Sequence, residues 1–383
     1  MLRQPSFAPL SPSWLYDPQP YFEILRAAAP IYRSQELNCW VVSRHADVRR
    51  VLTDHRGFAA DPRRAGRPLP GGGDSVQVVD PPGNIALRRT LTGLLGGRAE
   101  RVSAMEVRLL ARRELDGLAA AGGNLTAAIS VFSLGVTCAA LGMPVPSGQW
   151  LYPRSEAIVT AMDAGFRPEV IAASARAKVQ ISALIEDWLR TRRAPVVRGE
   201  LTTQLINSIR VIFHAGYTSL SRFLENASVL LLTDHSGRSD YLRLSRANRR
   251  CRALPELLRW TSTVQATTRF AVRPYLLAGE RISVGQPVIA LIASGNWDSL
   301  VFTEPSRLDF DRDCARSLSF GAGTHSCLGQ EFVADYAEIF LDELLGDSRW
   351  QISGASVRRG AATLRGWRTI PVVRSVANPV SNA

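Results

Sequence analysis

Lysine is almost absent from this chain, because Lys178 is the only one and arginine carries nearly all of the positive charge. The formal net charge is +12 over 383 residues, and so basic a balance is compatible with nucleic-acid binding. The arginines are nevertheless scattered along amphipathic stretches and do not gather in one tail or one aromatic-rich patch. We therefore predict no nucleic-acid binding, and interpret the positive surface as one that speeds encounter with an acidic protein partner.

The chain also lacks an apolar run long enough for a signal peptide or a membrane anchor, and prolines at positions 5, 9, 12, 18 and 20 break its N-terminal region. Its five cysteines show no CxxC or zinc-type spacing, which suits a reducing compartment. We therefore expect a cytoplasmic protein with no membrane contact. Four cysteines are interpreted as small buried hydrophobic residues: Cys39, Cys138, Cys251 and Cys314.

No linker, repeat or low-complexity tract divides the sequence, and 46% hydrophobic with 21% charged residues is the composition of a globular protein with a large core. We expect one domain over residues 1–383, mainly α-helical, with a minor β-rich portion at about 31–45 and 267–292. Helical spacing is found in 21–29, 46–53, 99–121, 125–141, 155–192 (in two pieces) and 202–233.

One stretch, residues 320–329, places a cysteine among small residues directly before a helix-patterned run at 330–345. The glycines at 321 and 323 allow tight or left-handed backbone and let a flat ligand approach closely. At a helix N-terminus, Cys327 faces the positive end of the helix dipole, which favours the thiolate that iron requires. We therefore predict that Cys327 binds a metal beneath a planar cofactor.

The decapeptide at 320–329, Phe-Gly-Ala-Gly-Thr-His-Ser-Cys-Leu-Gly, resembles the haem-ligand signature of the cytochrome P450 family, Phe-Gly-x-Gly-x-His-x-Cys-x-Gly. The resemblance implies the cytochrome P450 fold, with haem b as the cofactor and Cys327 as the iron ligand. It also implies that Phe320 packs against the sulfur side of the haem and that His325 reaches a haem propionate. Gly329 belongs to the same implied cofactor site.

A second cofactor-binding stretch reads Asp-Pro-Pro-Gly-Asn-Ile-Ala-Leu-Arg at 80–88, where prolines precede the start of a helix. The family usually has a histidine at the position of Asn84 and an arginine four residues later, both contacting haem propionates. Of these two, only Arg88 keeps the family's residue. Arg269, ten residues before Gly279, matches another propionate-binding arginine. The resemblance thus implies Asn84, Arg88 and Arg269 as cofactor contacts.

The longest helical pattern contains Ala215-Gly216-Tyr217-Thr218-Ser219, and a glycine inside a helix costs about 1 kcal/mol relative to alanine. Close packing of helices explains such a glycine. The family offers more, because it carries Ala-Gly-x-Asp/Glu-Thr here, the glycine giving room for dioxygen and the acid and alcohol relaying protons. By that resemblance Gly216, Thr218 and Ser219 are catalytic. Thr218 occupies the acid's position, so the ordinary proton donor is missing.

Glu256 and Arg259 are three residues apart, on one helical face, where they can form an ion pair. That spacing is common by itself, but upstream of Cys327 it resembles the structural Glu-x-x-Arg pair of the family. There an arginine shortly before the cysteine loop completes a buried network, and Arg312 is the match in this chain. We predict that these three residues hold the fold and take no part in the chemistry.

The resemblance implies a monooxygenase-type oxidoreductase of bacterial secondary metabolism acting on an aromatic or apolar small molecule. One expected reaction is oxidative C–C or C–N coupling, for example of tryptophan-containing cyclic dipeptides. Conventional hydroxylation is an alternative, and a non-catalytic haem-binding sensor or carrier is an alternative of another class. We expect a monomer that receives electrons from a separate ferredoxin and ferredoxin reductase. Substrate contacts implied by analogy are Ala86, Ala215, Val264, Phe270 and Trp367.

Overall fold

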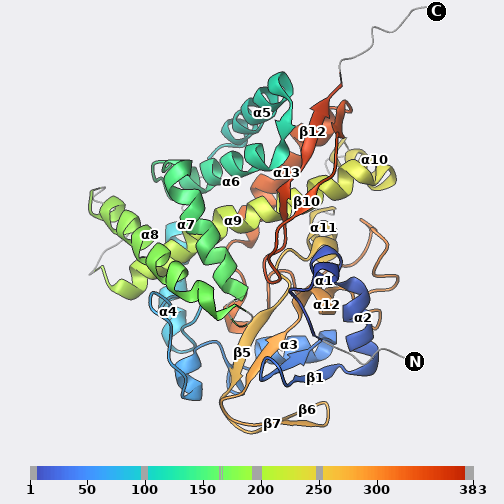
Figure 1. Ribbon diagram of the computed structural model, residues 1–383. Helices are drawn as coiled ribbons and strands as arrows, with labels where there is room; N and C mark the ends of the chain where they lie inside the picture. The colour runs from blue at the N-terminus through green and yellow to red at the C-terminus, as the bar shows by residue number, and fades with distance from the viewer. Residues whose placement is uncertain are drawn as a thin grey trace, which may run out of the picture.

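The computed structural model describes residues 7–95, 102–163, 165, 167–191, 201–246 and 253–375, and its longest described helix, α9 (Thr203–Thr233), crosses the middle of the molecule (Figure 1). At 1.5 Å per residue its 31 residues span about 46 Å. The side chain of Thr202 begins the helix by accepting a hydrogen bond from the N–H of Leu205. Most side chains of α9 are buried, so the other helices pack around it.

Three helices pack with α9 into the largest hydrophobic core. The first begins with a capping box, in which the Ser103 hydroxyl accepts from the Glu106 N–H while the Glu106 carboxylate accepts from the Ser103 N–H. Inside the core the rings of Phe132 and Phe340 lie 4.8 Å apart between centroids. The three helices are α5 (Ala104–Ala121), α6 (Leu125–Leu141) and α13 (Gln330–Gly346), and α10 (His235–Arg246) and α11 (Ala253–Thr261) pack beside them.

A second core lies toward the N-terminal half of α9. Phe213 and Tyr217 of that helix pack here with Ile181 of the long helix beside it and with Leu91. The helices of this region are α4 (Gly83–Leu95), α7 (Gly148–Thr160) and α8 (Ile171–Thr191). This part of α9 is therefore covered by three helices, α4, α7 and α8, that come from an earlier part of the chain.

The largest sheet has five strands in the order β1-β2-β8-β5-β3, formed by two widely separated parts of the chain. Only β2 and β8 run parallel, with Val41 opposite Ile289, and the other pairs are antiparallel. Its strands are β1 (Ile31–Ser34), β2 (Cys39–Val42), β3 (Phe58–Ala59), β5 (Thr267–Ala271) and β8 (Pro287–Ala290).

Short elements complete the described part of the fold. A hairpin near the C-terminal end, β10 with β11, reaches from the periphery toward α9, and β12 pairs with β9 and β4. The short helices are α1 (Pro12–Tyr16), α2 (Gln19–Ala28), α3 (His45–Thr53) and α12 (Ile292–Asn296); the short strands are β4 (Gly123–Asn124), β6 (Tyr275–Leu277), β7 (Glu280–Ile282), β9 (Trp350–Ile352), β10 (Val357–Arg358), β11 (Trp367–Thr369) and β12 (Pro371–Arg374).

The mainly helical architecture with a minor β component is confirmed. The strands between 350 and 374 were not predicted, because runs of two to four residues carry too little alternation to stand out. The helix predicted from residue 99 begins at Ala104, while residues 99–101 and Cys251 lie outside the described residues. That the chain is one domain stays a prediction. No helix in the described ranges is both long and apolar enough to cross a bilayer.

Candidate functional site

The cysteine loop is a tight backbone turn that ends where α13 begins. Gly321 and Gly323 take positive φ angles of 69° and 73°, a conformation that glycine adopts without strain. The Cys327 N–H donates to the Phe320 carbonyl at 2.8 Å, which closes the turn. The Gly329 N–H points back and donates to the Cys327 sulfur at 3.3 Å. The loop thus holds the sulfur in one orientation at the start of the helix.

At Gly323, the space that a side chain would need is taken by a neighbouring helix. A Cβ added there would lie 2.8 Å from the Leu52 carbonyl oxygen and 2.9 Å from the Thr53 Cα, both at the end of α3. The loop is therefore pressed against α3, and at position 323 the prediction of contact with a flat ligand is wrong. A Cβ at Gly321 would meet only loop backbone, at 3.8 Å or more.

The thiol of Cys327 is exposed, yet burial is the largest influence on it and raises its pKa. Both observations hold if the sulfur faces an open space inside the protein and not bulk solvent. The Gly329 N–H and the charge of Arg88 lower the pKa again, but they do not outweigh burial. The groups around the loop thus favour the thiolate as expected, but burial outweighs them in the chain without a bound cation.

Helix α4 turns one face toward this loop. The Asn84 amide N–H donates to the Thr324 carbonyl at 3.2 Å, and one turn later Arg88 donates to the Ser326 carbonyl at 2.8 Å. At about 100° per residue, Ala86 lies on the opposite face of the helix, where it is exposed. Ala86 is thus turned away from the loop, and its prediction as a substrate contact is wrong.

The interaction of His325 with Asp80 could not be seen in the sequence. The His325 Nε2 lies 2.9 Å from the Asp80 carboxylate, which also accepts from the N–H groups of Ala60 and Asp61 and pairs with Arg64 at 3.2 Å. Burial alone would raise the pKa of Asp80, but these hydrogen bonds outweigh it and lower the pKa to about 2. The other ring nitrogen of His325, Nδ1, is buried and has no partner in the described part of the chain.

Arg269 is a buried cation without an anion. Its side chain lies in β5, 8% exposed, and donates to the Thr267 hydroxyl at 3.1 Å and the Thr268 carbonyl at 2.9 Å. No carboxylate of the described residues pairs with it. Burial lowers the pKa of Arg269 to about 10, an effect that the more distant charge of Asp80 only partly opposes.

These groups meet the requirements of a planar, doubly acidic metal cofactor. A sulfur faces open space, and Arg88 and Arg269 bring two positive charges that find no carboxylate among the described residues. His325 adds a buried nitrogen with no partner. Asn84 fits less well, because its N–H group is used by Thr324 and its unpaired atom is an oxygen, an acceptor like a carboxylate. Asn84 therefore positions the loop.

On α9 the residues of the predicted oxygen site point in different directions. Ala215 is exposed between buried neighbours and Ser219, one turn on, is half-buried, so this face of the helix borders open space. Gly216 faces α6 instead, since a Cβ there would lie 3.1 Å from the Thr137 methyl carbon. Close packing of α9 against α6 therefore accounts for Gly216, which is the first of the two explanations that the sequence offered.

The hydroxyls of Thr218 and Ser219 also differ. Thr218 is buried and donates to the His214 carbonyl at 2.6 Å, within its own helix. That bond occupies its only proton in this structure, which does not support the predicted relay role of Thr218. Ser219 makes no such bond in the described structure and lies on the open face, so its hydroxyl proton is available.

Two of the remaining predicted substrate residues are turned away. Successive strand residues point to opposite faces of a sheet, so Phe270 lies on the other face of β5 from Arg269, where Arg67 sits 5.7 Å from its ring centroid. Trp367 packs against the large core, with the Arg358 guanidinium 3.7 Å from its ring centroid. Val264 forms an isolated β-bridge with Leu364 of the hairpin and remains compatible with its prediction.

The hairpin is pressed onto α9 one turn beyond Ser219. The Glu225 carboxylate, fully buried, accepts from Arg222 at 2.9 Å and from the Trp367 N–H at 2.7 Å. A Cβ on Gly366 would overlap the side chains of both Arg222 and Glu225. At the hairpin tip, the buried carboxylate of Asp163 accepts from two backbone N–H groups, those of Ala362 and Thr363, at 2.9 Å each.

The predicted structural residues form one buried network. Glu256 and Arg259 are 0% exposed and pair at 2.7 Å, and Arg312 reaches the other carboxylate oxygen of Glu256 at 3.1 Å. The remaining Arg259 N–H groups donate to the carbonyls of Asn296 and Pro305 at 2.8 and 2.9 Å. Both guanidinium groups here contact a carboxylate of the chain itself, that of Glu256.

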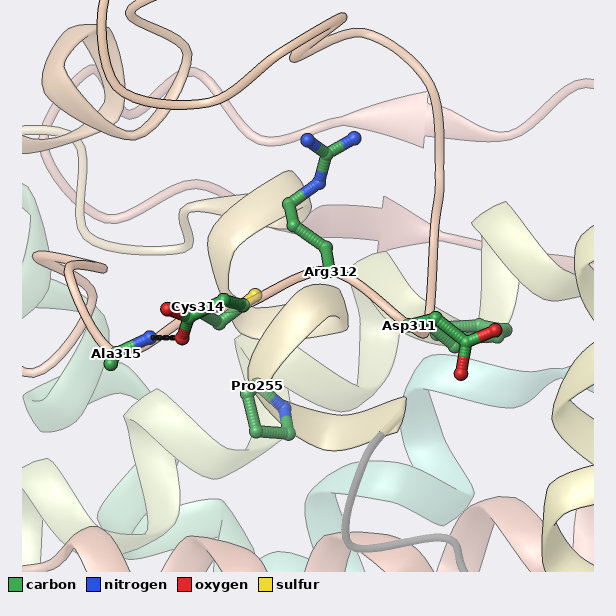
Figure 2. A pocket seen from close by; sticks show the side chains of 7 residues that line it. Pro255, Asp311, Arg312, Cys314 and Ala315 are labelled. Carbon is green, nitrogen blue, oxygen red and sulfur yellow. Dashed lines mark hydrogen bonds between the residues drawn. The ribbon is translucent and has the colours of Figure 1, made fainter.

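A pocket of about 540 Å³ opens beside this network, and Figure 2 shows Arg312 extending away from its Pro255 wall. The Cys314 thiol donates to Glu256 at 3.3 Å, and burial together with that carboxylate raises its pKa to about 12. Cys314 is thus an unreactive part of the network. The pocket is lined by Pro255, Phe310, Asp311, Arg312, Asp313, Cys314 and Ala315.

Comparisons with known proteins agree with this arrangement. No family model matches the chain. It is 29% identical to cytochrome P450-SU2 of Streptomyces griseolus over 94% of this chain and 95% of that protein. It is 28% identical to nocardicin C N-oxygenase of Nocardia uniformis subsp. tsuyamanensis, over 86% and 87%. Among solved structures, cytochrome P450 CYP109Q5 from Chondromyces apiculatus superposes with a TM-score of 0.78 at 26% identity, over 96% and 98%. CalO2 superposes with a TM-score of 0.85 at 22% identity, over 97% and 99%.

Proposed function

The chain belongs to the bacterial cytochrome P450 family of haem-dependent oxidoreductases, and from this premise we propose that it uses dioxygen to oxidise an apolar small molecule of secondary metabolism. Similar proteins named for a methyl hydroxylation, a 23-monooxygenation and an N-oxygenation support the proposal. The observation that carries it is Cys327, a sulfur facing an open space beside arginines that the described chain leaves without an anion.

Haem b is the cofactor of this family, and when bound it supplies the iron that activates dioxygen. We assign Cys327 as its ligand, with the sulfur oriented by the Gly329 N–H and Phe320 on the same loop. Arg88 and Arg269 would hold the two propionates, which gives the half-buried Arg88 and the buried Arg269 an anion that the described chain does not supply. The unpartnered Nδ1 of His325 is a further buried polar group on the loop that carries Cys327.

Proton supply rests on Ser219. Its hydroxyl lies on the open face of α9 and is not used by the helix, whereas the Thr218 hydroxyl is bound to the His214 carbonyl. With no acid at position 218, the proton that Ser219 Oγ passes on must come from solvent or from the substrate. Ser219, which occupies the position of the family's alcohol, is thus also the residue whose hydroxyl is free.

Insertion of oxygen is better supported than oxidative coupling. Coupling of an aromatic natural product, such as a tryptophan-containing cyclic dipeptide, was predicted from the missing acid at position 218 and from the family resemblance. The two aromatic residues expected to contact such a substrate, Phe270 and Trp367, are turned to other surroundings. Similar proteins are named for hydroxylation or oxygenation. Turnover under labelled dioxygen separates the two, because insertion leaves label in the product and coupling leaves none. The alternative of a non-catalytic sensor is set aside by membership of an enzyme family.

Electrons are proposed to come from a separate ferredoxin and its reductase, as in bacterial relatives of this kind. Exposed arginines near the cysteine loop, including Arg89 beside Arg88 and Arg316, suit an acidic partner. The four described cysteines are all free thiols, which suits the reducing cytoplasm as the place of action. A monomeric state stays a prediction.

One spectrum tests the assignment of the site. The reduced, haem-loaded protein with carbon monoxide is expected to show the strongly red-shifted band of a thiolate ligand, and Cys327→Ala is expected to abolish it. Cys314→Ala is the matched control, because that thiol belongs to the Glu256 network and should leave the band unchanged. A band that survives in Cys327→Ala would show that another residue binds the iron.

A further inference from the structure

A cavity of about 210 Å³ lies between the N-terminal segment (residues 7–22), the start of β5 and the tip of the β10–β11 hairpin. One wall is aromatic, because the Trp14 ring meets the rings of Phe7 and Phe22 edge-on, with centroids 5.3 and 5.5 Å away, and all three side chains are buried. Gln77 and Thr268 also line the cavity and are exposed. An apolar interior with a few polar groups is the usual composition of a small-molecule site.

The cavity adjoins the residues assigned to the cofactor. Thr267 lines it and lies on the same face of β5 as Arg269, and the Thr267 hydroxyl accepts a hydrogen bond from that arginine at 3.1 Å. Thr363 lines it from the hairpin tip, and three residues later Gly366 rests on α9. The walls of the cavity therefore belong to the elements that also reach Arg269 and α9.

The volume of the cavity suits one end of a substrate better than a whole molecule. Pockets that enclose a drug-sized ligand typically measure about 300–1,000 Å³, and this one measures about 210 Å³. The atom that is oxidised has to reach the iron assigned to Cys327, so a substrate that also enters this cavity places its far end there.

No charged side chain is among the described residues that line the cavity. Two charged groups next to its walls are engaged by the chain, Asp163 by backbone N–H groups of the hairpin tip and Arg365 by two carbonyls of the N-terminal segment. Arg269 is assigned to a propionate. An ionised end would lose its hydration here and gain no counterion, so the cavity favours a neutral one.

Two polar groups of the lining lack one hydrogen bond each. Gln265 is 5% exposed and its amide N–H donates to the Ser262 carbonyl, while its oxygen, Oε1, is buried and has no donor among the described residues. The Thr267 hydroxyl accepts from Arg269, and no described group accepts its own proton. Hydrogen bonds left unmade inside a protein cost free energy, so a ligand that donates one and accepts one would complete both.

Resting on the proposed function, we propose that this cavity binds the end of the substrate farthest from the oxidised atom, and that this end carries a neutral amide. An amide has an N–H donor for the Gln265 oxygen and a carbonyl acceptor for the Thr267 hydroxyl. A carboxylate has no donor and brings a charge, and an ester accepts but does not donate. The aromatic wall around Trp14 packs against the apolar part next to the amide.

Probes with one end fixed at the iron test the proposal on the haem-loaded protein. Imidazole binds haem iron, so ω-(imidazol-1-yl)alkanamides with about four to twelve methylene groups place an amide at increasing distances from it. The matched alkanoates and methyl esters are the comparisons, and the red shift of the Soret band measures binding. We expect the amide of at least one chain length to bind about tenfold or more tightly than the acid and the ester of that length.

Variants assign the preference to the cavity. Ala362→Leu fills it from the hairpin tip, at a half-buried position, and keeps the backbone N–H that Asp163 accepts. We expect this change to abolish the preference for the amide while imidazole itself binds as before. Ala315→Leu is the matched control, because it makes the same change in the pocket beside Glu256. Gln265→Leu should weaken binding of the amide and leave the ester unchanged, and should it fold poorly, Ala362→Leu alone decides.

Three results would overturn the proposal: equal binding of amide, ester and acid at every chain length, tighter binding of the acid, or a preference for the amide that Ala362→Leu leaves unchanged. The last would place the amide contact outside this cavity. Failure of the proposed function would appear elsewhere, as absence of the thiolate band with carbon monoxide. The two failures are therefore distinguishable in one preparation of protein.

Discussion

Two regions of this molecule bury arginine side chains in opposite ways. In the network of Glu256, Arg259 and Arg312, every charge meets an opposite charge or a carbonyl of the chain. Around the cysteine loop, Arg88 and Arg269 donate only to neutral groups and no described carboxylate pairs with them. Both regions are rich in hydrogen bonds, so the number of bonds does not distinguish them. What distinguishes them is whether each arginine contacts a carboxylate of the described chain.

The difference separates a region that the chain completes by itself from one that a ligand completes. A buried ion pair with all its hydrogen bonds made is costly to break, because removal of one partner strands the other. A buried cation with no counterion is already stranded, and binding of an anion relieves it. The first region is expected to govern folding, and the second to govern retention of the cofactor.

The largest expected effect is that of Glu256→Ala. The change leaves the fully buried Arg259 without its carboxylate, and breaking such a pair typically costs about 3–5 kcal/mol. We expect poorly folded protein with little haem, measured by circular dichroism and thermal unfolding. Asp240→Ala is the control, because its pair with Arg243 is exposed and is worth about 1 kcal/mol or less. Well-folded, haem-loaded but inactive Glu256→Ala would contradict the structural role.

Arg269→Met is expected to act on the cofactor and not on the fold. It removes a cation that no carboxylate of the described chain balances, so little stability should be lost, while one charged contact to a propionate disappears. Haem transfer to an acceptor apoprotein should be faster by about 10- to 100-fold, as expected for about 1.5–3 kcal/mol. Arg273→Met, an exposed change two residues past the end of β5, should alter neither. Unchanged haem retention would remove Arg269 from the site.

The same contrast occurs within one turn of α9, where the Thr218 hydroxyl is satisfied and the Ser219 hydroxyl is free. Ser219→Ala should lower product formed per electron consumed, by about tenfold or more if its proton is used. Thr218→Val should change that ratio much less, since it removes a proton already given to His214. A larger loss in Thr218→Val would reverse the assignment.

The smallest effect is a dependence on pH. Asp80 has an unfolded pKa of about 3.9 and a folded pKa of about 2, so its contribution is fully present above about pH 4 and is lost as the pH falls toward 2. The contribution is on the order of 2 kcal/mol. The difference in unfolding free energy between the wild type and Asp80→Asn should therefore shrink across that window. A difference that stays constant from pH 5 to 3 would show that the carboxylate is not held by its charge.

Spacing along one helix or one loop was enough to predict part of the site. Glu256 and Arg259 lie three apart, and Asn84 and Arg88 four apart, so each pair had to share a helical face. The cysteine loop is equally local. For the same reason the long helix at 203–233 and the helices on either side of it agreed closely with their patterns.

The errors arose where a side chain's direction depends on tertiary contacts. Ala86 and Phe270 are next to or near true site positions, but helix rotation and strand alternation turn them away. The pairing of His325 with Asp80 joins residues 245 apart, which no local pattern reveals.

Gly366 is the point where the hairpin rests on α9, and a larger residue there would have to displace Arg222 and Glu225, because a Cβ would overlap both side chains. Because glycine has no side chain, the hairpin already lies as close to α9 at this point as any residue allows. Its tip is held by the two hydrogen bonds to the Asp163 carboxylate. A larger residue at position 366 would therefore move the hairpin away from α9 and widen the space above its open face, at the expense of the Glu225 contacts. No substitution at this position would narrow that space.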